Sequence, residues 1–169
     1  DEDFRFRVKK IFKLNSHVVH NSIDINNVKK KSKSTEVDTF INSSSLNLVS
    51  VGRLTKQKDH ITILKAVNLI KEKIKVRLLI IGSGKEEKNL TDFIKENKLK
   101  KIVKMKNFTI NPYPHIRKAD IFILSSLYEG SPNVLLEAGA LNTLIISSNC
   151  DTGPRQILSY GKGGHLFKI

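Results

Sequence analysis

Residues 120–148, DIFILSSLYEGSPNVLLEAGALNTLIISS, decide the fold of this chain. The two ends of this stretch, 120–126 and 143–148, are short apolar runs of the kind that form buried strands. Between them, residues 133–141 predict a helix, and a Gly-Ser-Pro turn at 130–132 precedes it. A helical crossover of this kind joins parallel strands. The stretch therefore predicts one unit of a parallel sheet.

The same alternation of strand and helix extends in both directions from this unit. We expect further strands at 46–52, 76–84, 102–108 and 163–169, and helices at 58–73, 86–98, 111–119 and 153–160. Unbroken apolar strands separated by amphipathic helices are typical of a parallel sheet covered on both faces. The sequence therefore predicts an α/β fold with a doubly wound, Rossmann-like sheet that binds ligands beyond the carboxyl ends of its strands.

The first part of the chain has a different character. Residues 17–25, HVVHNSIDI, predict one short strand, and residues 29–45 are charged and Ser-rich, which indicates a linker or exposed loop. We therefore divide the chain into an interdomain segment and linker at 1–45 and a Rossmann-like domain at 46–169. The chain begins with DEDF and not with Met, so we interpret it as a piece of a longer protein.

Composition narrows the class of protein. Apolar residues make up 39% of the 169 residues and charged residues 27%, which is typical of a soluble globular domain. No apolar run approaches the roughly 20 residues that cross a bilayer. The one cysteine, Cys150, has no partner for an internal disulfide, which favours a cytoplasmic location.

The net charge of +14 is compatible with a polyanionic partner. However, only six of the 30 basic residues are arginine, and the lysines are scattered along the chain. Nucleic-acid readers concentrate arginine and interleave aromatic residues. The pattern therefore favours solvated helix faces over a nucleic-acid site, and it leaves a weak peripheral contact with an anionic membrane open.

The loops after the expected strands should meet at one edge of the sheet. Arg53 and Lys58 follow the first strand and suit a diphosphate, although a solvated loop explains them as well. Gly84 ends a Gly-Ser-Gly turn after the second strand, which allows close approach of a ligand or simply makes a tight turn. Neither a full dinucleotide-binding motif nor a P-loop is present.

Two glutamates flank the Gly-Ser-Pro turn, with seven residues between them. Glu129 precedes the turn and is suited to accept hydrogen bonds from sugar hydroxyls. Glu137 lies one turn into the helix, where its carboxylate is suited to both hydroxyls of a ribose. In the simpler interpretation, Glu129 is a strand-end charge and Glu137 a helix-surface residue, but the apolar neighbours of Glu137 fit an exposed glutamate poorly.

The turn itself has the features of an anion site. Gly130 and Ser131 leave the backbone open, and the proline at 132 near the first helical turn costs no hydrogen bond. The amides around Ser131, Asn133 and Val134 are expected to face an anion, helped by the helix dipole.

At this point the chain resembles the C-terminal, donor-binding domain of a GT-B glycosyltransferase of family 4. The resemblance runs from about residue 49 to the end, through VGRLTKQKD, LLIIGSGKEEKNL, ADIFILSSLYEGSPNVLLEAGA and CDTGPRQIL in the family's order. Glu129 and Glu137 match its pair of glutamates, and HNSID at 20–24 is similar to the segment between its two domains. Asp59 stands where many members have Gly, and Ser131 where an aromatic residue is common.

The resemblance implies a role for each candidate residue. Arg53 and Lys58 would bind the donor diphosphate and stabilise the leaving nucleotide, and Glu129 would contact the donor sugar. The other donor-binding residues would be Gly84, Phe108 beside the base, Gly130, Ser131, Asn133 and Val134 at the sugar and phosphate, and Glu137 at the ribose.

The resemblance also implies a reaction. It is retaining glycosyl transfer from a nucleotide-diphosphate sugar, with a UDP-sugar favoured over a GDP-sugar, without a cofactor, metal site or nucleic-acid partner. The glycan or lipid-linked acceptor would bind an N-terminal domain that this chain lacks, in bacterial surface polysaccharide synthesis. We therefore expect the chain by itself to be inactive.

Two other functions stay open. A non-transferring GT-B relative, such as a nucleotide-sugar epimerase or a phosphorylase, would need catalytic groups of its own, and no pyridoxal lysine is apparent. A basic module for nucleic acid or membranes would bind in a salt-sensitive way that survives loss of Glu129 and Glu137.

Overall fold

A parallel sheet forms the centre of the computed structural model, which describes residues 2–150 and 152–169. Within these residues the sheet has six strands in the order β3-β2-β1-β4-β5-β6, and all neighbours are parallel. The strands are β1 (Leu46–Val51), β2 (Val76–Ile81), β3 (Val103–Lys106), β4 (Ile121–Leu124), β5 (Leu144–Ser148) and β6 (His165–Phe167). The expected α/β fold class is confirmed.

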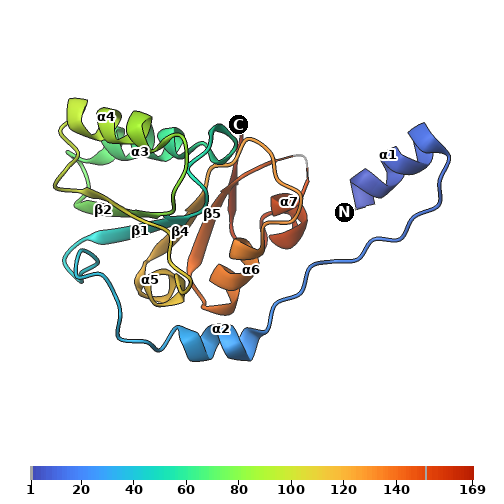
Figure 1. The fold of residues 1–169 in the computed structure, drawn as a ribbon, viewed down its shortest axis with the longest axis horizontal. Coiled ribbons are helices and arrows are strands. Elements are labelled where there is room, and N and C mark those ends of the chain that lie inside the picture. The colour runs from blue at the N-terminus through green and yellow to red at the C-terminus, as the bar shows by residue number, and fades with distance from the viewer. Residues whose placement is uncertain (1, 151) are drawn as a thin grey trace.

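Helices cover the sheet from both sides (Figure 1). They are α2 (Ile25–Lys31), α3 (His60–Ile70), α4 (Glu87–Glu96), α5 (Tyr113–Lys118), α6 (Asn133–Ala140) and α7 (Pro154–Ile157), with 3-10 turns η1 (Lys56–Lys58) and η2 (Ser159–Gly161). Helices α3 and α4 lie on one face, and α5 and α6 lie on the other. From residue 46 on, every expected element is present within a few residues, although the helix expected at 153–160 is divided into α7 and η2.

The core follows from the alternation of side chains along the strands. Leu48 and Leu78 point toward α3 and α4, while the next residues, Val49 and Leu79, point to the opposite face. All four are buried. Because both faces bury apolar side chains, these strands are apolar runs without a polar face. Beyond α3, side chains from β4, β5 and β6 line an open apolar groove of about 460 Å³.

The segment before the sheet differs from expectation. The described backbone of residues 17–25 forms no strand, and Val19 is 88% exposed. Residues 29–45, expected to be a linker or exposed loop, pack on the domain. Helix α2 buries Val28 against α5 and α6, and Lys104 pairs with Asp38 at 2.9 Å. Asp38 is thus a partner of the domain, whereas the other charged residues of the segment are exposed, as expected of a loop.

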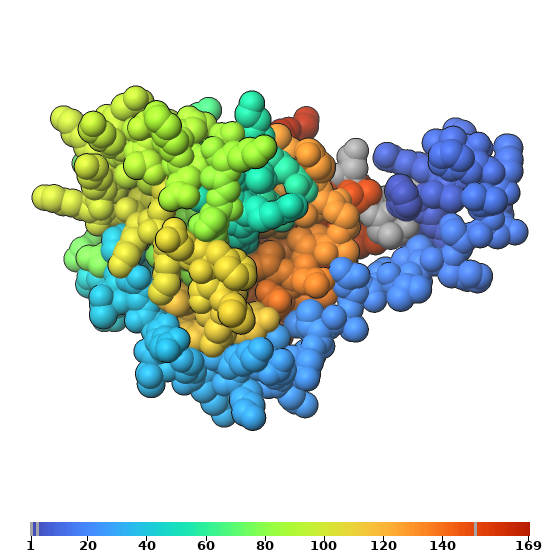
Figure 2. All heavy atoms as spheres, in the orientation of Figure 1, coloured from blue at the N-terminus to red at the C-terminus, as the bar shows by residue number. Residues whose placement is uncertain are grey.

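Helix α1 (Glu2–Phe12) stands apart from the sheet and its covering helices (Figures 1 and 2). It exposes Phe6, Ile11 and Phe12 and carries basic residues in its last turn. Among the described residues, no helix combines the length and the apolar character needed to cross a bilayer.

The loops after β1 and β2 pack so closely that glycine is required between them. A Cβ atom on Gly84 would lie 2.3 Å from the carbonyl oxygen of Leu54 and within 3 Å of two further backbone atoms of that residue. Gly84 therefore makes room for the chain itself, which explains the Gly-Ser-Gly turn by packing. In contrast, a Cβ atom on Gly139, in α6, would have no atom of another segment within 4 Å.

We therefore predict opposite effects for two matched substitutions in this chain. Gly84→Ala should lower the free energy of unfolding by about 2–3 kcal/mol, because neither backbone segment can move away cheaply. Gly139→Ala should raise it by up to about 1 kcal/mol, because alanine favours the helix. Urea denaturation of both variants measures the difference. A Gly84→Ala variant as stable as wild type would contradict the close packing of the two loops.

Candidate functional site

Two loops meet at the point where the strand order reverses. Strand β1 leads outward to β2 and β3, while its other neighbour, β4, leads to β5 and β6. The loops after β1 and β4 therefore lie side by side. The Leu127 amide donates to the Gln57 carbonyl at 2.8 Å, and the Gln57 side-chain amide donates to the Tyr128 carbonyl at 2.9 Å. Sheets of this type bind ligands at such a switch point.

The backbone around Lys58 is fixed by the same contact. The Ser125 hydroxyl, after β4, lies 2.9 Å from the Lys58 carbonyl oxygen and 2.8 Å from that of Asp59. Asp59 adopts the left-handed conformation, with φ 47° and ψ 44°, between η1 and α3. Asp tolerates this backbone region, and Gly would adopt it without strain.

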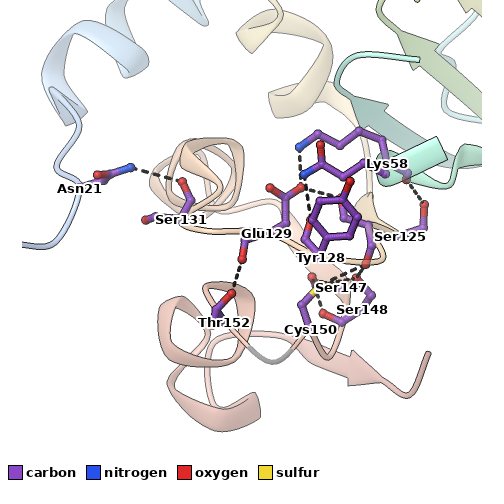
Figure 3. Close-up of polar contacts among 12 residues, drawn as sticks. Asn21, Lys58, Ser125, Tyr128, Glu129, Ser131, Ser147, Ser148, Cys150 and Thr152 are labelled. Atoms are coloured by element: carbon purple, nitrogen blue, oxygen red, sulfur yellow. Dashed lines mark hydrogen bonds and ion pairs between the residues drawn. The ribbon is translucent and has the colours of Figure 1, made fainter. Parts of the chain in front are cut away.

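Lys58 and Glu129 form a buried ion pair between the two loops (Figure 3). The Lys58 ammonium lies 2.5 Å from Glu129 Oε1, and the Ser126 hydroxyl donates to the same oxygen at 2.6 Å. The two side chains are only 14% and 8% exposed. From the sequence we expected Lys58 to contact a diphosphate and Glu129 to contact a sugar. The fold brings them into direct contact, which the sequence pattern does not indicate.

A cavity of about 570 Å³ opens at the carboxyl edge of the sheet, and Gly52, which lines it, lies against the Lys58 side chain. Three of the predicted residues, Arg53, Phe108 and Glu137, line it from three different segments. The Arg53 side chain is exposed, and no other described residue forms a hydrogen bond or ion pair with it. Phe108 is 73% exposed. The cavity thus combines an unpaired cation, an open aromatic ring and a carboxylate.

Glu137 has a partner that sequence analysis missed. The Tyr113 hydroxyl, at the start of α5, donates to Glu137 Oε1 at 3.1 Å. Burial raises the pKa of the Glu137 carboxyl, and this hydrogen bond acts in the opposite direction. The pKa of Tyr113 is raised by burial and then by the charge of Glu137. From the sequence we expected only a helix at 111–119, with no role for Tyr113.

The Gly-Ser-Pro turn is held from two sides. Asn21 donates from Nδ2 to the Ser131 carbonyl at 3.3 Å and to Asn133 Oδ1 at 2.8 Å, as Figure 3 shows for the first of these bonds. On the other side, the Thr152 hydroxyl donates to the Glu129 carbonyl, and Gly153 packs where a Cβ would lie 2.5 Å from the Gly130 carbonyl oxygen. These positioning contacts involve residues that sequence analysis did not select.

The turn also borders a second, smaller cavity of about 240 Å³. Gly130 and Ser131 line it together with residues 19–21. Helix α6 begins at Asn133, so the amides of Asn133 and Val134 belong to its first turn, where no helical carbonyl can accept from them. The Val134 side chain packs against the core and Gly84 packs against Leu54. For Val134, only the backbone is available to a ligand.

His60 adds no charge to this group at neutral pH. It is buried at the start of α3, and burial, followed by the charge of Lys58, lowers its pKa to about 4. The fixed positive charge of the site at neutral pH therefore comes from Arg53 and Lys58.

A double-mutant cycle tests the energy of the buried pair. Lys58→Met, Glu129→Gln and the double variant should give a coupling energy of about 2 kcal/mol or more in urea denaturation, because each single change leaves a buried group without its partner. The Lys88–Asp92 pair is the control, since its atoms are 2.6 Å apart but its side chains are 88% and 49% exposed. Its coupling should stay below about 0.5 kcal/mol. Equal coupling in both cycles would contradict a buried pair.

Comparison with known proteins identifies the family. The family model "Glycosyl transferases group 1" matches residues 32–169. An uncharacterized glycosyltransferase of Methanocaldococcus jannaschii is 31% identical over 94% of this chain and 43% of its own length. The N-acetylgalactosamine-N,N'-diacetylbacillosaminyl-diphospho-undecaprenol 4-alpha-N-acetylgalactosaminyltransferase of Campylobacter jejuni is 30% identical over 90% of this chain and 40% of its own length.

A solved structure shares the fold. The crystal structure of an S. aureus TarM variant in complex with UDP superposes with a TM-score of 0.83 and 18% identity, over 99% of this chain and 32% of that one. The chain thus spans less than half the length of each of these proteins. Because the family model covers most of the chain and the solved structure shares its fold, this protein belongs to the group 1 glycosyl transferases, with a domain of the GT-B fold.

Proposed function

We propose that this chain is the donor-binding domain of a retaining family 4 glycosyltransferase that moves a sugar from a nucleotide-diphosphate sugar. The acceptor is a glycan or a lipid-linked glycan, used in surface polysaccharide synthesis. One observation carries the proposal: Arg53, Phe108 and Glu137 converge on one cavity at the switch point of the sheet, beside the Lys58–Glu129 pair. A UDP-sugar is the favoured donor, and the UDP in the TarM structure supports this choice.

The donor fits this arrangement part by part. The nucleoside enters the 570 Å³ cavity, with its base at Phe108 and its ribose hydroxyls donating to the Glu137 carboxylate. The diphosphate lies between Arg53 and the first turn of α6, where free amides and the helix dipole favour an anion. The sugar extends toward Glu129, whose carboxylate accepts hydrogen bonds from its hydroxyls.

The site also supplies what the reaction requires. When the glycosidic bond breaks, negative charge develops on the departing nucleoside diphosphate, and fixed cations stabilise that charge. Arg53, without a partner among the described residues, and Lys58, held by Glu129, take the part that a metal plays in other enzymes. The C. jejuni relative, which by its name acts on a diphospho-undecaprenol-linked glycan, supports a lipid-linked acceptor.

The nucleotide and the role of Glu137 are tested by calorimetric titration of the full-length protein with UDP, GDP and ADP. We expect UDP to bind most tightly of the three. Glu137→Gln should weaken the affinity for UDP about tenfold or more, because hydrogen bonds to a charged acceptor are lost. Glu96→Gln, an exposed change in α4, is the control. Equal nucleotide affinity in both variants would remove Glu137 from the site. Binding of polynucleotides or anionic vesicles that survives Glu137→Gln, without nucleotide binding, would favour a basic binding module.

The same substitution should not lower the stability of the fold. The pKa of Glu137 is higher in the folded chain than its unfolded value of 4.5. The Glu137 carboxyl therefore contributes most to stability below its unfolded pKa. This contribution is lost as the pH rises through its folded pKa. At neutral pH the ionised Glu137 destabilises the fold, so Glu137→Gln should leave the free energy of unfolding unchanged or raise it while nucleotide affinity falls.

Turnover tests the charge of Arg53. Arg53→Ala in the full-length enzyme should lower kcat about 10²–10³-fold, because charge on the departing diphosphate loses a fixed cation. Lys56→Ala changes an exposed lysine of the same loop and should have little effect. Steady-state kinetics with and without a chelator measure both, and the chelator should not lower the wild-type rate. Similar rates for the two variants would exclude Arg53 from the mechanism.

A further inference from the structure

The contact between Tyr113 and Glu137 joins two helices at the 570 Å³ cavity. Tyr113 is the first residue of α5 and Glu137 lies in the middle of α6, and these helices pack together. Both side chains line the 570 Å³ cavity, and the Tyr113 hydroxyl lies 3.1 Å from Glu137 Oε1. Among the described residues, Tyr113 is the one side chain that hydrogen-bonds this carboxylate.

We propose that Tyr113 is a positioning residue of the donor site, whose hydroxyl orients the Glu137 carboxylate toward the ribose and thereby sets the selectivity for ribonucleotides over deoxyribonucleotides. The inference rests on the proposed function, in which Glu137 binds the ribose. Tyr113 itself is not a catalytic residue, since it acts through Glu137.

The geometry of the carboxylate explains how one hydroxyl can do this. A carboxylate offers about four acceptor positions on its two oxygens. Tyr113 occupies one position on Oε1, which fixes the rotation of the group and leaves Oε2 and the rest of Oε1 for two vicinal hydroxyls. Without the tyrosine hydroxyl, the terminal torsion of a glutamate is broad and has no strongly preferred angle. The Glu137 carboxylate would then have to be ordered when the two ribose hydroxyls bind, which costs binding free energy.

The hydrogen bond also affects protonation. A carboxylate in this partly buried place has a raised pKa, and the Tyr113 hydroxyl opposes that rise by stabilising the ionised form. A protonated Glu137 would lose acceptor capacity toward the ribose. Removal of the Tyr113 hydroxyl should therefore raise the pKa of Glu137 further and make donor binding fail at a higher pH than in wild type.

Few other charges reach Glu137. Arg53 lines the same cavity from the loop after β1, and it is present in every variant below. The neighbouring helices α2, α5 and α7 carry charged or titratable side chains that do not line this cavity, namely Lys29, Lys30, Lys31, His115, Arg117, Lys118 and Arg155. The contact with Tyr113 is therefore the local feature that a substitution can change selectively.

The test uses Tyr113→Phe in the full-length protein, which keeps the ring and removes only the hydroxyl. Tyr160→Phe is the matched control, since Tyr160 is 71% exposed in η2. Three sets of quantities are measured: donor KM and kcat across a pH series, the Kd of the nucleoside diphosphate that binds wild type, and the Kd values of its 2′-deoxy and 3′-deoxy analogues.

We expect Tyr113→Phe to raise the donor KM and the ribonucleotide Kd about fivefold to tenfold, with kcat nearly unchanged. The acid limb of kcat/KM should move to higher pH. The ratio of deoxy to ribo Kd should shrink by a similar factor, and in a Glu137→Gln background Tyr113→Phe should have no further effect on this ratio. Tyr160→Phe should match wild type in all of these quantities.

Two outcomes would overturn the inference. One is a Tyr113→Phe enzyme with the wild-type acid limb and the wild-type deoxy-to-ribo ratio, whether or not its stability or kcat falls, because a merely structural role leaves both unmoved. The other is a Glu137→Gln enzyme that keeps the wild-type ratio, in which case the ribose role of Glu137 in the proposed function fails as well. A ratio that falls in Glu137→Gln but not in Tyr113→Phe rejects only the role of Tyr113.

Discussion

The contact between the loops after β1 and β4 is the constraint on which the rest of the site depends. The reversal of strand order puts these loops side by side, and hydrogen bonds from Ser125, Leu127 and Gln57 hold them in register. Because the backbone of Lys58 is fixed in this way, its side chain can reach Glu129 across the switch point. The position of α6, and with it Glu137, follows from the loop that carries Glu129.

The Lys58–Glu129 pair keeps two opposite charges buried at the switch point of the sheet. A buried charge without a partner is costly, and each of these side chains satisfies the other while Ser126 supplies a further hydrogen bond. In the donor complex that we propose, a diphosphate oxygen would lie near Lys58 and sugar hydroxyls near Glu129. The pair would then loosen while Lys58 keeps a charged partner and Glu129 keeps hydrogen-bond donors, which makes donor binding an exchange of partners.

Glu137 illustrates the opposite balance between stability and function. Burial raises its pKa, so the ionised carboxylate is a burden for the folded chain at neutral pH. In the donor complex that we propose, an ionised and oriented carboxylate is the best acceptor for the ribose hydroxyls. The hydrogen bond from Tyr113 lowers the cost of ionisation and, in our proposal, also sets the orientation of the carboxylate. Perturbed carboxylates of this kind in a cavity are common at functional sites, and here the perturbation has an identified cause and an identified partner.

Local patterns in the sequence were sufficient for the elements, and they selected Arg53, Phe108 and Glu137, which the fold brings to one cavity. Apolar runs and helical spacing located each strand and helix from residue 46 on, because both faces of the sheet are buried and leave a strong periodic signal. The prediction of a strand at 17–25 was wrong, because this apolar run has no neighbouring strand with which its backbone could pair. The partners of Glu129, Glu137 and Ser131 were decided only by tertiary structure. Lys58, Tyr113 and Asn21 lie 71, 24 and 110 residues away in the chain, and no local period links residues that strand order and helix packing bring together.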